Sequence, residues 1–136
     1  MVNYKVFCFF GLFIVMLGSI AMAEMEASHG TIDDDGVQRV VILGGGYFFK
    51  PDHVIVKVNV PVEMMIRKED GFIPHNFIIE APEAGIEVNE GMSSDPKVVR
   101  FTPTKVGMYS YYCSKKLLFF DDHRKKGMEG ILEVVE

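Results

Sequence analysis

The sequence contains only two cysteines in 136 residues and has no excess of positive charge. Its net charge of −5 gives no overall attraction to DNA, RNA or an anionic membrane surface, so an electrostatic partner must recognise a local patch. The sequence also lacks internal repeats, low-complexity tracts and linkers rich in proline, glycine or serine. These absences argue against a nucleic-acid-binding protein and favour one compact domain.

The N-terminus contains a long apolar run. Val6 to Leu17 follows the single cation Lys5 and leads into the small-x-small ending Ala21-Met22-Ala23. This pattern is typical of a secretory signal peptide cleaved after Ala23, and it predicts export to the periplasm. An uncleaved anchor is the alternative, because residues 6–23 carry no charge and reach the length of about 18 residues that a spanning helix needs. We expect cleavage, after which no membrane span remains.

Cleavage leaves a single cysteine in the exported protein. Cys8 is removed with the signal peptide and Cys113 remains, so an internal disulfide is excluded. A lone exposed thiol is prone to oxidation in an oxidising compartment, and we therefore expect Cys113 to be buried or bound. The chain is divided into a signal peptide (1–23), a flexible leader (24–36) and one domain (37–136).

Alternation of apolar and polar residues predicts about seven short strands and an all-β fold. Val54, Val56, Val58 and Val60 would line one face of a half-buried strand. The other expected strands cover 37–43, 63–67, 76–79, 97–101, 108–113 and 131–135. Glycines and prolines separate these segments, and only 115–126 has a pattern compatible with a helix. We therefore predict an antiparallel sandwich or a small barrel.

The last third of the sequence contains a set of soft metal ligands. Alternation over 108–113 places Cys113 at the inward-facing end of a strand, and His75 begins another predicted strand. His123 follows the cysteine by ten residues, and Met128 follows His123 by five. Calcium and magnesium prefer oxygen and zinc rarely takes a thioether, so this set selects copper. Two imidazoles and a thiolate in a plane, with a weak axial sulfur, form an electron-transfer copper site.

Each candidate ligand also has a structural interpretation, because a cysteine at the end of a core strand commonly serves as a small hydrophobe. The joint order of histidine, cysteine, histidine and methionine favours metal binding over four unrelated core residues. The two remaining histidines, His29 and His53, are interpreted as surface residues.

These residues resemble the cupredoxins, the type 1 blue copper proteins of the plastocyanin and azurin kind. The matching segments are Phe49-Lys50-Pro51, Pro74-His75-Asn76-Phe77, Phe101-Thr102-Pro103, Tyr112-Cys113-Ser114 and Gly127-Met128-Glu129-Gly130. The resemblance implies a Greek-key sandwich with one copper, whose ligands are His75, Cys113, His123 and Met128. It also implies that Asn76 and Ser114 are hydrogen-bonded across the site. By the same likeness, His123 would be the more exposed imidazole and the exit for the electron.

One spacing departs from the family pattern. Nine residues, 114–122, separate Cys113 from His123, whereas plastocyanin-like proteins have only a few at this place. The longer loop could form a short helix that packs its apolar side chains against the end of the barrel and still presents His123. It could instead leave a coordination position open or make the site labile, with Asp121 or Asp122 as a competing oxygen ligand.

The same loop has a local positive charge. Residues 115–126 contain five basic and two acidic side chains, a net charge of +3. A positive, partly apolar end would attract an acidic redox partner protein to this loop, with more effect on encounter than on affinity. The alternative is a solvated loop whose lysines only keep residues 117–120 soluble.

Three functions fit these features. The first is single-electron transfer by a periplasmic, monomeric copper protein, and this is the function we expect. The second is a periplasmic copper carrier or tolerance protein, whose long loop lets the metal leave. The third is a small copper redox enzyme with an open coordination position, for which His53 and Glu129 are the acid–base candidates. A dinuclear copper centre is excluded because it needs two cysteines.

Overall fold

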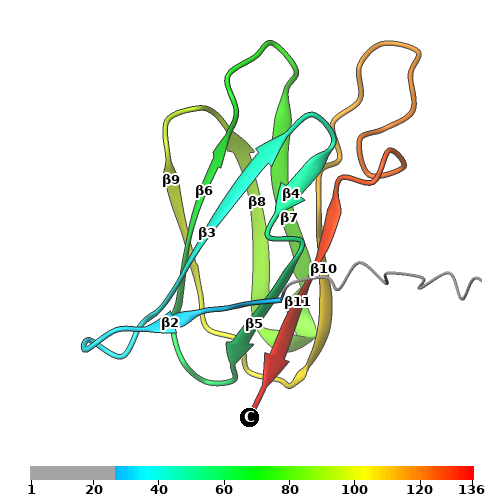
Figure 1. Cartoon of the computed structure of the whole chain (residues 1–136). Coiled ribbons are helices and arrows are strands. Elements are labelled where there is room, and N and C mark those ends of the chain that lie inside the picture. Colours follow the sequence, from blue (N-terminus) through cyan, green and yellow to red (C-terminus); the bar gives the residue numbers. More distant parts are fainter. Residues whose placement is uncertain (1–26) are drawn as a thin grey trace, which may run out of the picture.

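The protein is a sandwich of two β-sheets, seen in a computed structural model that describes residues 27–136 (Figure 1). The expected signal peptide, 1–23, lies outside the described residues. One sheet has the strand order β1-β5-β11-β10-β7-β8, and the other has the order β2-β3-β6-β9 with β4 paired to β3. The all-β prediction is confirmed, and the sheets form an open sandwich. In residues 27–136 no helix is long and apolar enough to cross a membrane.

Both sheets contain parallel and antiparallel pairs. The strands of the first sheet are β1 (Ser28–His29), β5 (His53–Lys57), β7 (His75–Ala81), β8 (Ile86–Met92), β10 (Gly107–Tyr112) and β11 (Glu129–Val135). Those of the second sheet are β2 (Thr31–Ile32), β3 (Gln38–Gly45), β4 (Phe48–Lys50), β6 (Val62–Lys68) and β9 (Lys97–Phe101). Because β5 runs parallel to β1 and β11, and β3 runs parallel to β6, the antiparallel pairing that we predicted holds for only some of the strand pairs.

The core lies between the sheets and follows the alternation of the sequence. In β6, Val62, Met64 and Ile66 are buried while the residues between them face outward. One buried polar side chain joins the sheets: the Gln38 amide accepts from the Lys57 backbone N–H at 2.6 Å and donates to the Lys57 carbonyl at 3.0 Å. These bonds satisfy the buried amide, which would otherwise destabilise the core.

Three local predictions need correction. The valine strand ends at Lys57, because Asn59 takes a positive φ of 60° and turns the chain, so Val60 lies beyond the strand. Residues 28–32 of the expected flexible leader pair with β5 and β3 as β1 and β2. Strands β4 and β8 were not expected.

The loop from residue 113 to residue 128 contains turns and no helix, so the short helix proposed for 115–126 is wrong. Its apolar side chains do not pack against the sandwich, since Leu118, Phe119 and Phe120 are exposed. The loop projects from the same end of the sandwich as the β6–β7 connection (Figure 1).

Candidate metal centre

Three strand ends bring the predicted ligands together at one end of the sandwich. His75 is the first residue of β7, and Cys113 directly follows β10, which pairs with β7. His123 and Met128 lie in the loop that leads from β10 to β11. Because β10 lies between β7 and β11, the ends of these strands are neighbours. Segments far apart in sequence therefore contribute to one cluster.

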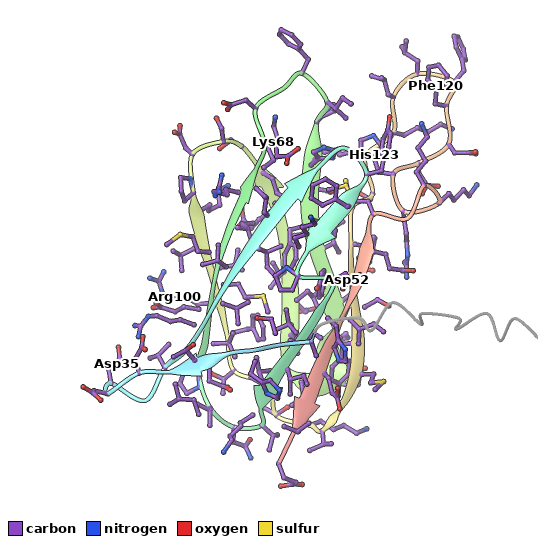
Figure 2. The ribbon with its side chains drawn as sticks, in the orientation of Figure 1. Asp35, Asp52, Lys68, Arg100, Phe120 and His123 are labelled. Atoms are coloured by element: carbon purple, nitrogen blue, oxygen red, sulfur yellow. The ribbon has the colours of Figure 1, made fainter. Side chains whose placement is uncertain are left out.

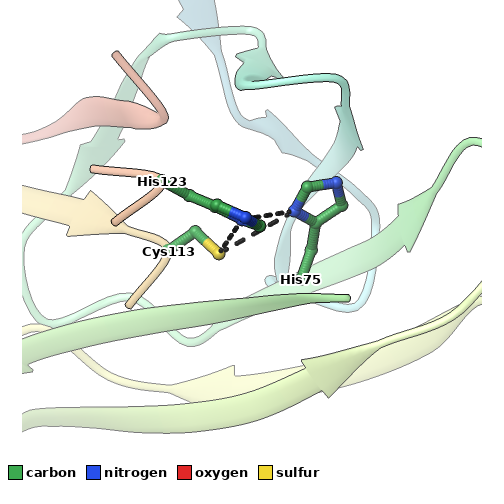
Figure 3. Close-up of side chains that lie close together, drawn as sticks. All are labelled: His75, Cys113 and His123. Carbon is green, nitrogen blue, oxygen red and sulfur yellow. Dashed lines mark hydrogen bonds between the residues drawn. The ribbon is translucent and has the colours of Figure 1, made fainter. Parts of the chain in front are cut away.

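The donor atoms of His75, Cys113 and His123 form a small triangle (Figure 3). The two Nδ1 atoms are 3.1 Å apart, and the Cys113 Sγ lies 3.5 Å from His123 Nδ1 and 3.9 Å from His75 Nδ1. The point equidistant from the three atoms lies about 2 Å from each, similar to the bond from a transition metal to an imidazole nitrogen. The residues therefore fit a bound transition-metal ion.

The side chains of the cluster are almost entirely buried. The thiol of Cys113 is free and buried, and Met128 is also buried. His123 has no exposed surface and His75 retains only 5%. Among residues 27–136, these two histidines and Cys113 form the one close group of three or more His, Cys, Asp or Glu residues. A dry site strengthens the interaction of fixed ligands with a cation.

Asn76 and Ser114 connect the two chain segments behind the cluster, as the resemblance implied. The Asn76 side chain donates to Ser114 Oγ at 2.9 Å and accepts from the Ser114 backbone N–H at 2.8 Å. The Asn76 backbone N–H also donates to the Cys113 sulfur at 3.4 Å. Such bonds hold ligand side chains in place and tune their donor strength.

Backbone hydrogen bonds hold the long loop so that His123 reaches the cluster. The His123 N–H donates to the Lys115 carbonyl at 2.9 Å, and the Met128 N–H donates to the His123 carbonyl at 3.0 Å. The Cys113 N–H in turn donates to the Met128 carbonyl at 3.1 Å. The extra residues therefore form a loop whose two ends are hydrogen-bonded to each other. The longer spacing between Cys113 and His123 does not separate the ligands.

The two aspartates considered as oxygen ligands do not join the cluster. The carboxylate of Asp122 instead accepts the Lys125 backbone N–H at 2.9 Å, which stabilises the turn after His123. Asp121 is exposed. Both acids are therefore ordinary loop residues in this structure.

The expectation that His123 is the more exposed imidazole is wrong. The Tyr47 ring meets the His123 ring edge-on at 5.1 Å, and the Lys126 ammonium lies above the Tyr47 ring. Beneath this cover, His123 Nε2 is buried without a hydrogen-bond partner. His75 instead lines a small hollow of about 60 Å³ with Gly45, Lys68 and their neighbours. Tyr47 lies in the tight turn between β3 and β4, and the sequence offered no signal for its contact because the long, irregular β10–β11 loop brings His123 to it.

A second methionine also lies beside the cluster. Met92 is buried and pairs with His75 across β7 and β8. A Cβ atom on Gly44 would lie 3.3 Å from Met92 Sδ and 3.3 Å from Met128 Cε, so both thioether side chains lie next to this glycine. Only the pairing of β7 with β8 places Met92 here.

The remaining histidines stay outside the cluster. His29 is exposed, as expected. His53 is half-buried rather than a surface residue, and its Nε2 lies 2.8 Å from a carboxylate oxygen of Glu133. Glu129, the other acid–base candidate, pairs with Arg124 at 2.6 Å.

The metal-free protein is expected to lose stability in acid. Burial, together with the charges of His123 and Lys68, lowers the pKa of His75 from the usual 6.5 to about 4. Burial and Lys126 also lower the pKa of His123. Between pH 6.5 and about 4 the unfolded chain therefore binds more protons than the folded protein. The free energy of unfolding is thus highest above pH 6.5 and falls as the pH is lowered towards 4. Urea unfolding at several pH values measures this loss, which should shrink in His75→Gln and persist in His29→Gln.

No protein-family model matches the chain, and a search of curated proteins finds no match. Among solved structures, the metal binding domain of the Streptococcus pneumoniae D39 Cu(I) exporting P-type ATPase CopA has a TM-score of 0.63 at 20% identity, covering 82% of this chain and 98% of that one. Auracyanin B has a TM-score of 0.56 at 15% identity, and the match covers 79% of this chain and 95% of that one. The periplasmic domain of cytochrome oxidase subunit II of Bradyrhizobium japonicum has a TM-score of 0.56 at 17% identity, and the match covers 72% of this chain and 83% of that one. The chain has the cupredoxin fold.

Proposed function

We propose that the protein binds one copper ion and carries single electrons. The ligands in this proposal are His75, Cys113, His123 and Met128. The observation that supports it best is the buried triangle of one sulfur and two imidazole nitrogens, whose centre lies about 2 Å from each donor. A thiolate and two imidazoles in a plane, with a weak thioether, form the donor set of blue copper sites. Copper bound there would take up and release one electron.

The protein contributes to electron transfer by holding the ligand side chains in fixed, buried positions. The Asn76 bonds to Ser114 and to the Cys113 sulfur hold the cysteine, and the loop hydrogen bonds hold His123. Ligands fixed in this way move little when the charge of the metal changes, which keeps the reorganisation on electron transfer small. An electron carrier also fits better than an enzyme, since the side chains of His53 and Glu129 are hydrogen-bonded to Glu133 and Arg124 outside the cluster.

The proposal places the protein in the periplasm. Its support is the apolar run of residues 6–17 and the similarity of the domain to a structure described as the periplasmic domain of an oxidase subunit. We also propose that it works as a monomer.

A copper carrier is the second candidate, and one observation favours it. The hollow beside His75 approaches the cluster from outside, whereas Tyr47 covers His123. A partner ligand could reach the metal through this hollow. The similar CopA domain is itself described as binding Cu(I).

Adding cupric ion to the purified protein tests the copper site. We expect an intense thiolate-to-copper absorption in the visible range, which Cys113→Ala abolishes because the thiolate is lost. The matched control is His29→Ala, which removes an exposed histidine elsewhere and should keep the full absorption. A spectrum like that of aqueous copper in the unmodified protein would contradict the site.

Reduction of the copper-loaded protein separates the two candidates. Repeated oxidation and reduction with the metal retained supports electron transfer. Loss of copper to a chelator on reduction supports the carrier and contradicts electron transfer.

A further inference from the structure

Large apolar side chains at the metal-site end project into solvent from two separate loops. Phe72 is fully exposed in the β6–β7 loop. In the β10–β11 loop Phe119 is 99% exposed, Leu118 is 75% exposed, and Phe120 lies at the loop tip (Figure 2). Side chains this exposed contribute almost nothing to the core, and several of them on one end of a molecule indicate an interaction surface.

Basic side chains flank the apolar tip of the β10–β11 loop. Residues 115–126 carry a net charge of +3 in a chain of net charge −5, so the negative charge lies elsewhere. Arg124 and Lys125 pair with acids, and Lys126 lies above the rings of Tyr47 and Phe120. Lys115 and Lys116 are exposed directly before the apolar segment. The β6–β7 loop contains the acidic residues Glu69 and Asp70, whose charge is offset by Arg67 and Lys68 at the end of β6.

We propose that this end of the protein adsorbs to an anionic lipid surface. Phe72, Leu118 and Phe119 would enter the interface between headgroups and acyl chains, and Lys115 and Lys116 would contact the phosphates. Apolar insertion combined with basic headgroup contacts is how peripheral proteins bind membranes.

The shape of the surface favours a lipid over an acidic protein. The exposed apolar side chains stand on the tips of two separate loops. A lipid interface accepts such isolated projections without matching their shape, whereas a folded partner needs a pocket for each of them. The positive charge beside the tips then selects anionic headgroups.

Adsorption would bring the metal-site end against the bilayer, because the ligand cluster lies at the base of the same loops. The contact uses none of the metal ligands. Metal-free and copper-loaded protein should therefore bind vesicles alike, and failure of the copper proposal would leave this one intact.

The absence of tryptophan from the sequence allows a direct test. In Phe119→Trp the only tryptophan stands at the loop tip, and in Met108→Trp it stands at the start of β10, 68% exposed, at the other end of that strand from Cys113. Vesicles of phosphatidylglycerol and phosphatidylcholine in equal parts should shift the emission of Trp in Phe119→Trp to the blue, and brominated acyl chains should quench it. Met108→Trp should show neither effect. Each variant carries its single tryptophan at a different place on the same fold, so binding through the metal-site end should change the emission of Phe119→Trp and leave that of Met108→Trp unchanged.

Two further variants connect the signal to the proposed contacts. Adding Phe72→Ser and Leu118→Ser to Phe119→Trp should weaken partitioning about tenfold, because apolar insertion is lost. Adding Lys115→Gln and Lys116→Gln should remove the preference for anionic over pure phosphatidylcholine vesicles. The proposal is overturned if Phe119→Trp shows no blue shift with anionic vesicles, or if Met108→Trp responds equally. A response to soluble polyglutamate but not to vesicles would also overturn it, in favour of an acidic protein partner.

Discussion

Replacing Gly130 with alanine is expected to lower the free energy of unfolding by about 3 kcal/mol. A Cβ atom at this position would overlap the Tyr111 ring and lie 2.6 Å from the Asp52 carbonyl oxygen. The ring cannot easily move away, because it is fully buried and its hydroxyl donates to the Pro51 carbonyl at 2.7 Å. The glycine stands near the start of β11, two residues after Met128, so we expect looser metal retention as well.

Gly91→Ala is the matched control for this substitution. Gly91 lies inside β8, where a Cβ atom would meet nothing within 4 Å. Denaturant unfolding of both variants measures the difference, and the control should stay within about 0.5 kcal/mol of the unmodified protein. Equal stability of the two variants would show that Tyr111 and Asp52 do not confine Gly130.

Replacing Asn76 with alanine is expected to destabilise the protein by about 2 kcal/mol and to weaken copper retention by about 10- to 100-fold. The change leaves the Ser114 backbone N–H without its acceptor and removes the donor to Ser114 Oγ. Both bonds cross between β7 and the segment after β10, so their loss frees Cys113 relative to His75. The predicted effect on copper therefore exceeds what the stability change alone would produce.

Asn89→Ala provides the control, because Asn89 is an exposed asparagine on the neighbouring strand β8. Urea unfolding measures the stability of each variant, and competition with a chelator measures copper retention. If Asn76→Ala loses stability but keeps copper as firmly as Asn89→Ala does, the Asn76–Ser114 bonds support the fold and not the metal site.

The alternation of side chains was sufficient to predict most of the strands. The segment 97–101 is β9 with the expected ends, and the other predicted strands are displaced by only a few residues, apart from the early end of the valine strand. Strand β8 was missed because Asn89, Glu90 and Gly91 interrupt its apolar pattern. Its pairing with β7 stabilises it all the same. The alternation of apolar and polar residues predicts a strand well where one face of the strand is buried and the other is exposed to solvent.

The candidate ligands were predictable for a different reason. A thiol at the inward end of one strand and an imidazole at the start of another must lie at the same end of a sandwich if those strands are neighbours. His75 and Cys113 follow from this rule, because β7 and β10 are paired. The position of His123 did not follow, since turns and backbone hydrogen bonds, and no repeating pattern, set the path of residues 114–122.

Residue types and their order were therefore enough to indicate an all-β chain and a soft metal site. The direction in which strands pair, the burial of His123 beneath Tyr47 and the approach of Met92 to Met128 depended on folding. Each of these features arises from contacts between segments that are remote in the chain, and the free energy of such contacts depends on the whole packed arrangement. Periodicity within a segment reports which face is buried, but it carries no information about what the buried face meets.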